Sequence, residues 1–433
     1  MTTMMAHKVA LRPTKAQQEY FAQCSGTARL AYNWGLEQWS TQYAAWKENN
    51  ELPKPSLYPL MRQFNAIKRD NWPWIDSISS NPPKYALMQL GEAFKNFFAG
   101  RAKYPTKRKY SSKARFELDA TGLSVQGKRI RVPLLGWVKM TEEVRWSGKI
   151  KKVHISRVGG RWFASFAVET TDLDCLAGTA TDKATGIDLG LKTAAVLADG
   201  TEYSAPKPYK AMEARLRRLS RSMSRKVGPD WRKQQKASEN WKKAKRKIEK
   251  LHAKIANQRR DWMQKTTTEI ARTYGLIGME KLNVDGMKRN RRMAKAISDV
   301  AMFEFRREVE YKAALRGGKV VLAGTFYPST KTCSNCGFVL GSIKLNTRQW
   351  ACPACGAEHD RDVNAAINLK KLAEGYPVIA CGEESSGKGQ GRKTKARVKL
   401  ASVKQEGKQT PIDNRKPSRR KLERESGFGS ISC

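Results

Sequence analysis

The chain has 433 residues, of which 40% are hydrophobic, so about two to four domains with substantial cores are expected. Lysine and arginine number 83 against 40 acidic residues, a formal net charge of +43. A compact protein with this charge repels itself, and a polyanion is the simplest compensation, so nucleic acid is favoured over a membrane surface as partner. No apolar run approaches the roughly eighteen residues of a bilayer-spanning helix.

The first residues, MTTMMAHKVALRPT, contain no apolar segment of the kind that marks a secretory signal. Without such a signal, the eight cysteines favour a reducing compartment and metal binding over disulfides. We therefore expect a cytoplasmic protein.

The N-terminal region is predicted to combine a strand with helices. Residues 5–12 alternate like a strand, and Pro13 ends it. Thr14 then opens a helix, with Gln17 placed for a capping box. Residues 14–98 are mainly helical in pattern.

Strand-like runs dominate residues 100–172. The best defined are two apolar runs on either side of Gly159 and Gly160, which predict a β-hairpin. We expect the first strand of the chain to pair with these later strands. The predicted unit is a basic β-barrel-like module made of residues 1–13 and 99–175, with residues 14–98 as a helical recognition insertion.

The central region alternates between apolar strands and basic helices. Residues 182–200 predict two strands and a turn, whereas residues 207–260 are helical and carry 20 basic residues against 4 acidic ones. Gly228 and Pro229 divide this segment, which predicts an antiparallel helical hairpin over residues 207–265. Along the second helix, apolar residues recur at alternating intervals of three and four, which predicts a coiled-coil-like packing seam. These residues are Trp241, Ala244, Ile248, Leu251 and Ile255.

Further along, residues 275–280 predict a short buried strand, residues 297–315 a helix and residues 319–322 another strand. The last 52 positions, residues 382–433, hold 14 basic and 6 acidic residues and one aromatic residue. This composition is typical of a basic disordered tail.

Four of the eight cysteines form two C-x-x-C pairs separated by fifteen residues: Cys333, Cys336, Cys352 and Cys355. Each pair is followed by glycine and forms a tight knuckle, and two such knuckles can close a tetrahedral thiolate cage around Zn²⁺. All four ligand positions are filled, so we predict one structural zinc, whereas a catalytic zinc needs an open position.

Three acidic positions are unusual for their surroundings. Asp188 lies in an apolar strand between Gly186 and Gly190, and Glu280 ends the strand GLIGME. A buried acid must be neutral, paired or bound to metal. Carboxylates suit Mg²⁺, and two Mg²⁺ ions can stabilise the attacking and leaving oxygens of a phosphodiester. The glycines beside Asp188 are interpreted as leaving room for a phosphate backbone.

The third acidic position opens the last predicted helix, in the stretch HDRDVNAAINL. Either Asp360 or Asp362 can serve here, because a carboxylate at a helix start can also be an ordinary cap. Arg361 between them can pair with Asp360 or contact a phosphate. From the residues alone, both choices stay open.

The order of these acids, on a β-hairpin, a strand and a helix, is that of an RNase H-like nuclease core. At this point the sequence resembles the TnpB (OrfB) family of transposon-encoded RNA-guided nucleases, relatives of the type V CRISPR effectors. The resemblance covers about residues 5–372. The segments that carry it are LRPTKAQQEYFAQCSGTARLAYNWGL, TGIDLGLKTAAVLADG, GMEKLNV, TKTCSNCG, CPACG and DRDVNAAINL.

The resemblance implies an RNA-guided DNA endonuclease that binds a guide RNA from the transposon end, recognises a short target-adjacent motif and cuts both DNA strands in one RuvC site. It assigns the catalytic Mg²⁺ ligands to Asp188, Glu280 and Asp362. It further implies a mixed α/β fold with a RuvC-like nuclease domain (182–329 and 357–374) interrupted by a zinc ribbon (330–356). The expected partners are guide RNA, double-stranded target DNA and its displaced strand, in the bacterial or archaeal cytoplasm at the nucleoid.

Four other functions remain open from the sequence. A compact type V CRISPR effector shares the same core and acids, and a repeat array beside the gene distinguishes it. A non-cutting RNA-guided repressor is expected to lack one of the three acids. A zinc-ribbon transcription or RNA-processing protein leaves Asp188 and Glu280 unexplained, and a strand-joining transposase is compatible with the fold alone.

Overall fold

The computed structural model describes residues 2–110, 114–171, 182–230, 232–324, 327–344 and 347–375. The predicted basic tail, residues 382–433, lies outside these ranges. Within them, no helix has both the length and the apolar character needed to cross a membrane.

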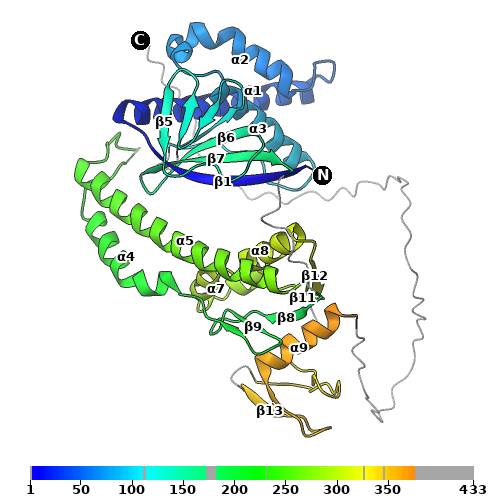
Figure 1. The fold of residues 1–433 in the computed structure, drawn as a ribbon. Helices are drawn as coiled ribbons and strands as arrows, with labels where there is room; N and C mark the ends of the chain where they lie inside the picture. Colours follow the sequence, from blue (N-terminus) through cyan, green and yellow to red (C-terminus); the bar gives the residue numbers. More distant parts are fainter. Residues whose placement is uncertain are drawn as a thin grey trace, which may run out of the picture. The chain divides into compact units, whose positions relative to one another are not determined.

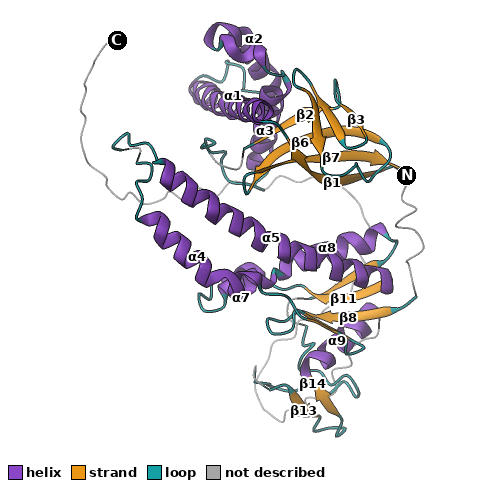
Figure 2. Ribbon diagram, turned by 60° about the vertical axis from the view of Figure 1, so that its left-hand side comes forward, coloured by secondary structure: helices purple, strands orange, loops and turns teal. Residues whose placement is uncertain are grey.

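The first half of the chain forms a seven-stranded antiparallel sheet with the order β2-β6-β7-β1-β5-β4-β3 (Figure 2). Strand β1 lies in the middle, paired with β7 on one side and β5 on the other, as the sequence predicts. Strands β2 and β3 are the two ends, and no pairing between described residues joins them, so barrel-like closure stays a prediction. The strands are β1 (Thr3–Arg12), β2 (Arg115–Asp119), β3 (Ser124–Gln126), β4 (Arg129–Val132), β5 (Gly136–Met140), β6 (Lys149–Val158) and β7 (Arg161–Thr170).

The predicted hairpin is confirmed between β6 and β7. Gly159 and Gly160 have φ angles of +58° and +84°, both in the left-handed region. A two-residue turn with two positive φ angles matches the twist of the flanking strands, and glycine adopts it without steric cost.

A helical layer is inserted between β1 and β2. The predicted capping box at its start is confirmed, because Thr14 Oγ1 accepts from the backbone N–H of Gln17 and the Gln17 side chain accepts from the N–H of Thr14. The helices are α1 (Lys15–Glu48), α2 (Leu57–Asn71), the 3-10 turn η1 (Pro73–Ser77) and α3 (Asn81–Phe98).

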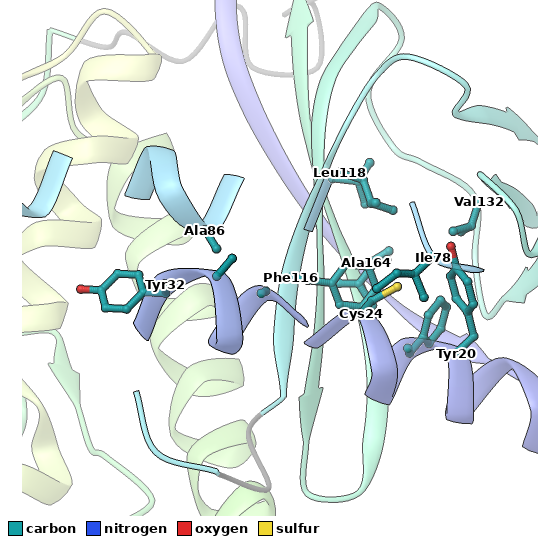
Figure 3. Packing of buried hydrophobic residues seen from close by; sticks show 14 of the residues in the cluster. Tyr20, Cys24, Tyr32, Ile78, Ala86, Phe116, Leu118, Val132 and Ala164 are labelled. Carbon is teal, nitrogen blue, oxygen red and sulfur yellow. The ribbon is translucent and has the colours of Figure 1, made fainter. Parts of the chain in front are cut away.

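These helices share one core with the sheet. Figure 3 shows Tyr20 and Cys24 of α1 beside Ile78, while Phe116 of β2 and Ala164 of β7 face the same interior. Both Cys24 and Ala164 are fully buried. The insertion therefore packs as an integral layer of the N-terminal fold.

The second half of the chain is built on a five-stranded mixed sheet with the order β10-β9-β8-β11-β12. Strands β8, β11 and β12 are parallel, and β9 and β10 are antiparallel additions. The bounds are β8 (Ala184–Asp188), β9 (Ala195–Leu197), β10 (Glu202–Tyr203), β11 (Leu276–Glu280) and β12 (Lys319–Ala323).

Helices cover both faces of this sheet. Helix α8 (Met302–Leu315) and the end of α5 (Glu239–Thr273) pack on one face through Phe305, Val309 and Ile270. Helix α9 (Arg361–Ala373) crosses β8 and β11 on the other face (Figures 1 and 2). The arrangement is a three-layer α/β sandwich.

The basic helical hairpin consists of α4 (Pro208–Ser224) and α5, as predicted. Leu216 of α4 packs against Leu251 and Ile255 of the predicted seam. The α5 helix continues to Thr273, eight residues beyond the predicted end of the hairpin at residue 265. The reason is that its last turns carry apolar residues into the core under the sheet.

The single helix predicted over residues 297–315 is wrong in one respect. Two helices, α7 (Ala294–Val300) and α8, meet at Ala301, whose φ is +59°. Alanine has no preference for this left-handed conformation, so nothing in the local sequence marks the break. A short helix, α6 (Val284–Lys288), precedes them.

The cysteine segment between β12 and α9 contains a small two-stranded sheet, β13 (Gln349–Ala351) and β14 (Glu358–Asp360). Strand β14 runs directly into α9. The cysteine segment is therefore joined without a spacer to the helix that covers the second sheet.

Candidate functional site

Asp188 and Glu280 end two adjacent parallel strands. The register pairs Ile187 of β8 with Met279 of β11, which brings the two acids side by side at the carboxyl edge of the sheet. Ile187 and Met279 belong to the core on the α5 and α8 face. Because side chains alternate along a strand, both carboxylates lie on the opposite face, the one covered by α9.

The glycines of these strands have a packing function. A Cβ added to Gly186 lies 1.8 Å from the Ala366 carbonyl oxygen, and one added to Gly278 lies 2.0 Å from that of Leu369. A Cβ on Gly190 lies 2.6 Å from the carbonyl of Thr193. The hypothesis that Gly186 and Gly190 leave room for a phosphate backbone is therefore wrong, because protein backbone fills that space.

Asp188 has an altered proton affinity. Burial and the neighbouring Glu280 carboxylate raise the pKa of Asp188 to about 7, although the positive charges of Arg361 and Arg348 act in the opposite direction. Two carboxylates close together in a poorly solvated place resist ionisation unless a cation neutralises them. This pair has the character of a cation site.

Glu280 is held by a neighbouring loop. The Ser329 hydroxyl donates a short hydrogen bond to Glu280 Oε1, and Ser329 is almost fully buried. The Ser329 carbonyl accepts from Asn368 Nδ2 of α9 at 2.8 Å. Ser329 thus connects the Glu280 carboxylate to α9.

The two aspartates at the start of α9 have different environments. Asp360 is the N-cap, and its Oδ1 accepts from the backbone N–H groups of Asp362 and Val363 at 2.9 and 3.0 Å. Asp362 lies in the first turn, mostly buried. The cap function of Asp360 leaves Asp362 as the carboxylate that faces other side chains.

Two arginines pair with Asp362. Arg361 donates to Asp362 Oδ1 through Nε and Nη2, at 3.1 and 2.9 Å. Arg348, just before β13, forms an ion pair with Oδ2. The Arg348 backbone carbonyl also accepts from the N–H of Arg361 at 2.7 Å. Arg361 was expected to pair with Asp360 or to contact a phosphate, and in the structure it pairs with the Asp362 carboxylate.

The four cysteines come together as predicted. Their Sγ atoms all lie within 4.8 Å of one another, a set that could hold a metal ion. Backbone N–H groups of Gly337 and Gly356 donate to the carbonyls of Cys333 and Cys352, closing each knuckle. A hydrogen bond from the Ala357 backbone lowers the pKa of Cys355 to about 6, which favours the thiolate that binds metal.

The first knuckle is attached to α9 by buried amides. Asn364 accepts from the N–H of Ser334 at 2.8 Å and donates to the Thr332 carbonyl at 2.7 Å. Asn368 donates to the same carbonyl at 2.7 Å. Asn364 and Asn368 are 1% and 3% exposed, so these hydrogen bonds cannot be exchanged for water without cost.

The predicted site residues therefore form two groups. Within the described ranges, the cysteines are the only cluster of three or more metal-ligand side chains. Asp188 and Glu280 end neighbouring strands and Asp362 lies in the first turn of the helix that crosses them, but the three acids do not close into such a cluster. Sequence reasoning missed Ser329, Arg348 and Asn368, because each contributes through a partner far along the chain. The one available signal was the pair of asparagines in the stretch NAAIN, because Asn364 and Asn368 are four residues apart and share one face of the helix.

Comparison with known families gives three matches along the chain. A family described as "Probable transposase" matches residues 165–291, and one described as "Cas12f1-like, TNB domain" matches residues 303–369. A family described as "Helix-turn-helix domain" matches residues 1–48. In this structure, the N-terminal segment matched by the helix-turn-helix family consists of strand β1 and one continuous helix, α1.

Relatives match over nearly the whole chain. A protein of Streptomyces pristinaespiralis named "Putative RNA-guided DNA endonuclease" is 34% identical over 410 residues, 93% of this chain and 96% of that protein. InsQ of Escherichia coli, which has the same description, is 31% identical, covering 88% of this chain and 95% of InsQ. The full-length relatives define the class as proteins named RNA-guided DNA endonucleases, and the first family match adds the description of a probable transposase.

A mimivirus protein named TnpB-like protein L79 is 32% identical over 143 residues, 31% of this chain and 26% of that protein. Taken with the full-length relatives, the matches show that the chain belongs to the TnpB family. Among solved structures, a cryo-EM structure of a Cas12f1–sgRNA–target DNA complex matches with a TM-score of 0.32 and 17% identity, covering 85% of this chain and 99% of that one.

Proposed function

We propose that this TnpB-family protein is the RNA-guided DNA endonuclease of a transposon. The observation that carries the proposal is the similarity to relatives named as RNA-guided DNA endonucleases over almost the full length of both chains. The Asp188–Glu280 pair beneath α9 gives such an activity a place in the fold. The net charge of +43 suits a protein that binds two polyanions, RNA and DNA.

We assign the second half of the chain, residues 182–329 and 357–374, to an RNase H-like (RuvC) nuclease domain. The mixed five-stranded sheet supports this assignment. Asp188 and Glu280 end the first and fourth of its strands in chain order, and Asp362 lies on the helix that crosses one face. We assign residues 330–356 to a zinc ribbon. The N-terminal sheet and its helical insertion would then form the nucleic-acid-binding module, with a barrel-like closure.

Asp188, Glu280 and Asp362 would hold the two catalytic Mg²⁺ ions. The donor set fits, because all three are carboxylates, and burial with the neighbouring Glu280 carboxylate raises the pKa of Asp188, which a bound cation would offset. When bound, two Mg²⁺ ions supply an activated water and stabilise the leaving oxygen of a phosphodiester. Ser329 orients Glu280, and the Asp360 cap fixes the helix turn that presents Asp362.

Arg348 and Arg361 would exchange partners during the reaction. In the free protein they neutralise Asp362. If Asp362 held a divalent ion, Arg348 and Arg361 would be available to a scissile phosphate, which guanidinium groups can bind in bidentate fashion. Both arginines lie close enough to Asp188 for their positive charges to lower its pKa.

The cysteine cage would hold one structural Zn²⁺. Four thiolates suit zinc, and the cage has no open position for substrate. In this proposal, target sequence is read by base pairing with the guide RNA, and the protein binds the heteroduplex through its backbone.

The decisive experiment removes each proposed Mg²⁺ ligand. We expect Asp188→Ala, Glu280→Ala and Asp362→Ala each to lower Mg²⁺-dependent DNA cleavage by about a thousandfold or more, because the acids act as one unit. Binding of the RNA that copurifies from the native locus is expected to persist. The first measurement is cleavage of a plasmid that carries the matching target. The second is sequencing of the RNA that copurifies with each variant.

Asp360→Ala is the matched control. It removes a helix cap, which costs about 1 kcal/mol of stability, but keeps all three proposed metal-binding carboxylates, so cleavage is expected to fall far less than for Asp362→Ala. If Asp360→Ala is inactive while Asp362→Ala cuts normally, the assignment of the third ligand is wrong. If the purified protein carries no RNA, the RNA-guided function itself is wrong.

A further inference from the structure

His359 contacts a sulfur of the cysteine cage. Its Nε2 atom lies 3.0 Å from the Cys333 Sγ, whereas the Asn335 Nδ2 lies 3.7 Å from the Cys355 Sγ. His359 belongs to β14, in the hairpin whose loop is the second knuckle, and Cys333 belongs to the first knuckle. The contact therefore joins the two halves of the cage, although His359 is not one of the residues that close it.

Trp350 orients the His359 ring. The two residues are directly opposed in the β13–β14 pair, so their side chains lie on the same face of the hairpin. Their ring centres are 4.8 Å apart, and the ring planes are tilted by 42°. Tilted and offset arrangements are the ones that aromatic pairs prefer. The packing against Trp350 therefore holds the imidazole in place beside Cys333.

The Cys333 sulfur depends on the protein for a hydrogen-bond donor. Cys333 is only 1% exposed, so water has almost no access to it, whereas Cys355 is exposed. Four thiolates around a doubly charged ion leave a net negative charge on the cage. A buried anion is costly unless protein donors replace its hydration.

The chemistry of the pair determines which partner donates. A thiolate bound to a metal has no hydrogen and can only accept, so the His359 Nε2 must carry the hydrogen. Hydrogen bonds to an ionised acceptor are shorter and roughly twice as strong as those between neutral groups. Donation by His359 would therefore offset part of the negative charge on a buried sulfur.

We propose that His359 donates a hydrogen bond to the metal-bound Cys333 thiolate and thereby strengthens the binding of zinc by the cage. His359 is a positioning residue in this role, because it acts on the metal through a ligand. The next residue, Asp360, is the N-cap of α9, so the same hydrogen bond also links the cage to the start of that helix. The inference rests on the Zn²⁺ assignment of the proposed function.

Two substitutions separate the hydrogen bond from the packing of the ring. His359→Phe keeps an aromatic ring against Trp350 but removes the donor. His359→Gln removes the ring but keeps an N–H group, because the Nε2 atoms of glutamine and histidine are the same number of bonds from Cβ. His252→Phe is the matched control, since His252 is exposed on α5, outside the cysteine segment.

The first measurement is the zinc affinity of the full chain, determined by competition with a chelator of known affinity. We expect His359→Phe to lower the affinity about 10- to 100-fold, the usual effect of losing the hydrogen-bond partner of a metal ligand. His359→Gln can still donate, so its affinity is expected to fall by less than about threefold. The His252→Phe control is expected to bind zinc as the wild type does.

The second measurement is the absorption spectrum of the chain loaded with Co²⁺ in place of Zn²⁺. Thiolates bound to Co²⁺ give a charge-transfer band, in which an electron moves from sulfur to the ion. A hydrogen bond lowers the energy of the sulfur electrons, so its loss moves this band to longer wavelength. We expect the shift for His359→Phe and not for His359→Gln, whereas a change of packing alone predicts the reverse order of effects.

The outcomes distinguish the inference from the zinc assignment on which it rests. If His359→Phe binds zinc as tightly as the wild type, or leaves the Co²⁺ band unshifted, the inference is overturned and the proposed zinc site remains. Equal losses of affinity in His359→Phe and His359→Gln also overturn it, because His359 would then act through packing. A wild-type chain that binds no zinc overturns both the inference and the proposed zinc ribbon.

Discussion

At the scale of single residues, Ser329 has the most consequential position outside the acids. Its hydroxyl holds Glu280, and its carbonyl is held by Asn368 of α9. It is a positioning residue, because it acts on the proposed site through a carboxylate. Its hydrogen bond fixes the orientation of an acid that must otherwise be restrained by the metal alone.

Ser329→Ala is therefore expected to raise the Mg²⁺ concentration needed for half-maximal cleavage by about tenfold, the usual effect of losing a partner of a metal ligand. The melting temperature should change little, since one hydroxyl is removed. Ser224→Ala, which removes an exposed hydroxyl at the end of α4, is the control. An unchanged Mg²⁺ dependence for Ser329→Ala would contradict the positioning role.

Glu117 of β2 predicts a pH dependence of stability. Burial by itself raises the pKa of Glu117, but hydrogen bonds from His154, Lys152 and Gln89 outweigh it and lower the pKa to about 2. A carboxylate with a lowered folded-state pKa stabilises the fold above its unfolded value of 4.5, and this contribution disappears as the pH falls toward 2.

We expect Glu117→Gln to lower the free energy of unfolding by about 1 to 3 kcal/mol at neutral pH, because a neutral amide replaces the buried carboxylate that accepts from Lys152, His154 and Gln89. The difference from wild type should shrink between about pH 4.5 and pH 2. Urea unfolding at several pH values measures it. Glu37→Gln, at an exposed ion pair with Lys107, should change stability by less than about 0.5 kcal/mol at any pH.

At the scale of elements, the close contact of α9 with β8 and β11 determines where Asp362 lies. The helix approaches so closely that only glycine fits at positions 186 and 278. The sequence predicts both strands and the helix correctly. Gly186 could not be interpreted correctly, because the helix that occupies the space beside it contacts it through Ala366, far along the chain.

Gly186→Ala is expected to destabilise the protein by about 3 kcal/mol and to reduce cleavage, because its methyl group meets the Ala366 carbonyl and forces α9 away from β8. Gly26→Ala is the matched control within a helix. A Cβ there meets nothing within 4 Å, so we expect stabilisation by up to about 1 kcal/mol. Chemical unfolding of both variants checks the pair, and equal effects would contradict the packing argument.

The break between α7 and α8 shows the limit of prediction for elements. Periodicity continues through residues 297–315, so a single helix is the natural expectation. Buried Ile297 and Val300 belong to one hydrophobic cluster and Phe305 belongs to another. The chain turns at Ala301 so that residues on both sides can reach their own cluster. The left-handed backbone of Ala301 is therefore required by the packing of both clusters and not by the local sequence.

At the scale of the whole molecule, α9 connects the cysteine cage to the sheet that carries Asp188 and Glu280. Asn364 and Asn368 bind the backbone of the first knuckle, and β14 leads directly into the helix. A metal that closes the cage therefore also fixes the start of α9. Loss of the metal should therefore make the position of Asp362 less well fixed, although the residue itself is unchanged.

We expect Cys333→Ser/Cys336→Ser, or removal of zinc by a chelator, to unfold the cysteine segment and lower cleavage indirectly. Zinc content by atomic absorption and hydrogen exchange at residues 361–369 are the measurements, because the structure predicts faster exchange at the start of α9. Full cleavage by the zinc-free double variant would contradict this coupling.

The sequence by itself determined the classes of element, the four-cysteine cage and the identity of the two strand-end acids. These follow from periodicity, from ligand spacing and from the cost of an acid in an apolar strand, all of which are local. It left Asp360 and Asp362 equivalent until family resemblance was added.

Only the tertiary structure shows that those two aspartates have different surroundings. Asp360 caps α9, and Asp362 pairs with Arg348 from the cysteine segment. The tertiary structure also brings Ser329 to Glu280. The physical reason is the same in each case: strand register and helix packing bring together residues whose separation along the chain carries no signal.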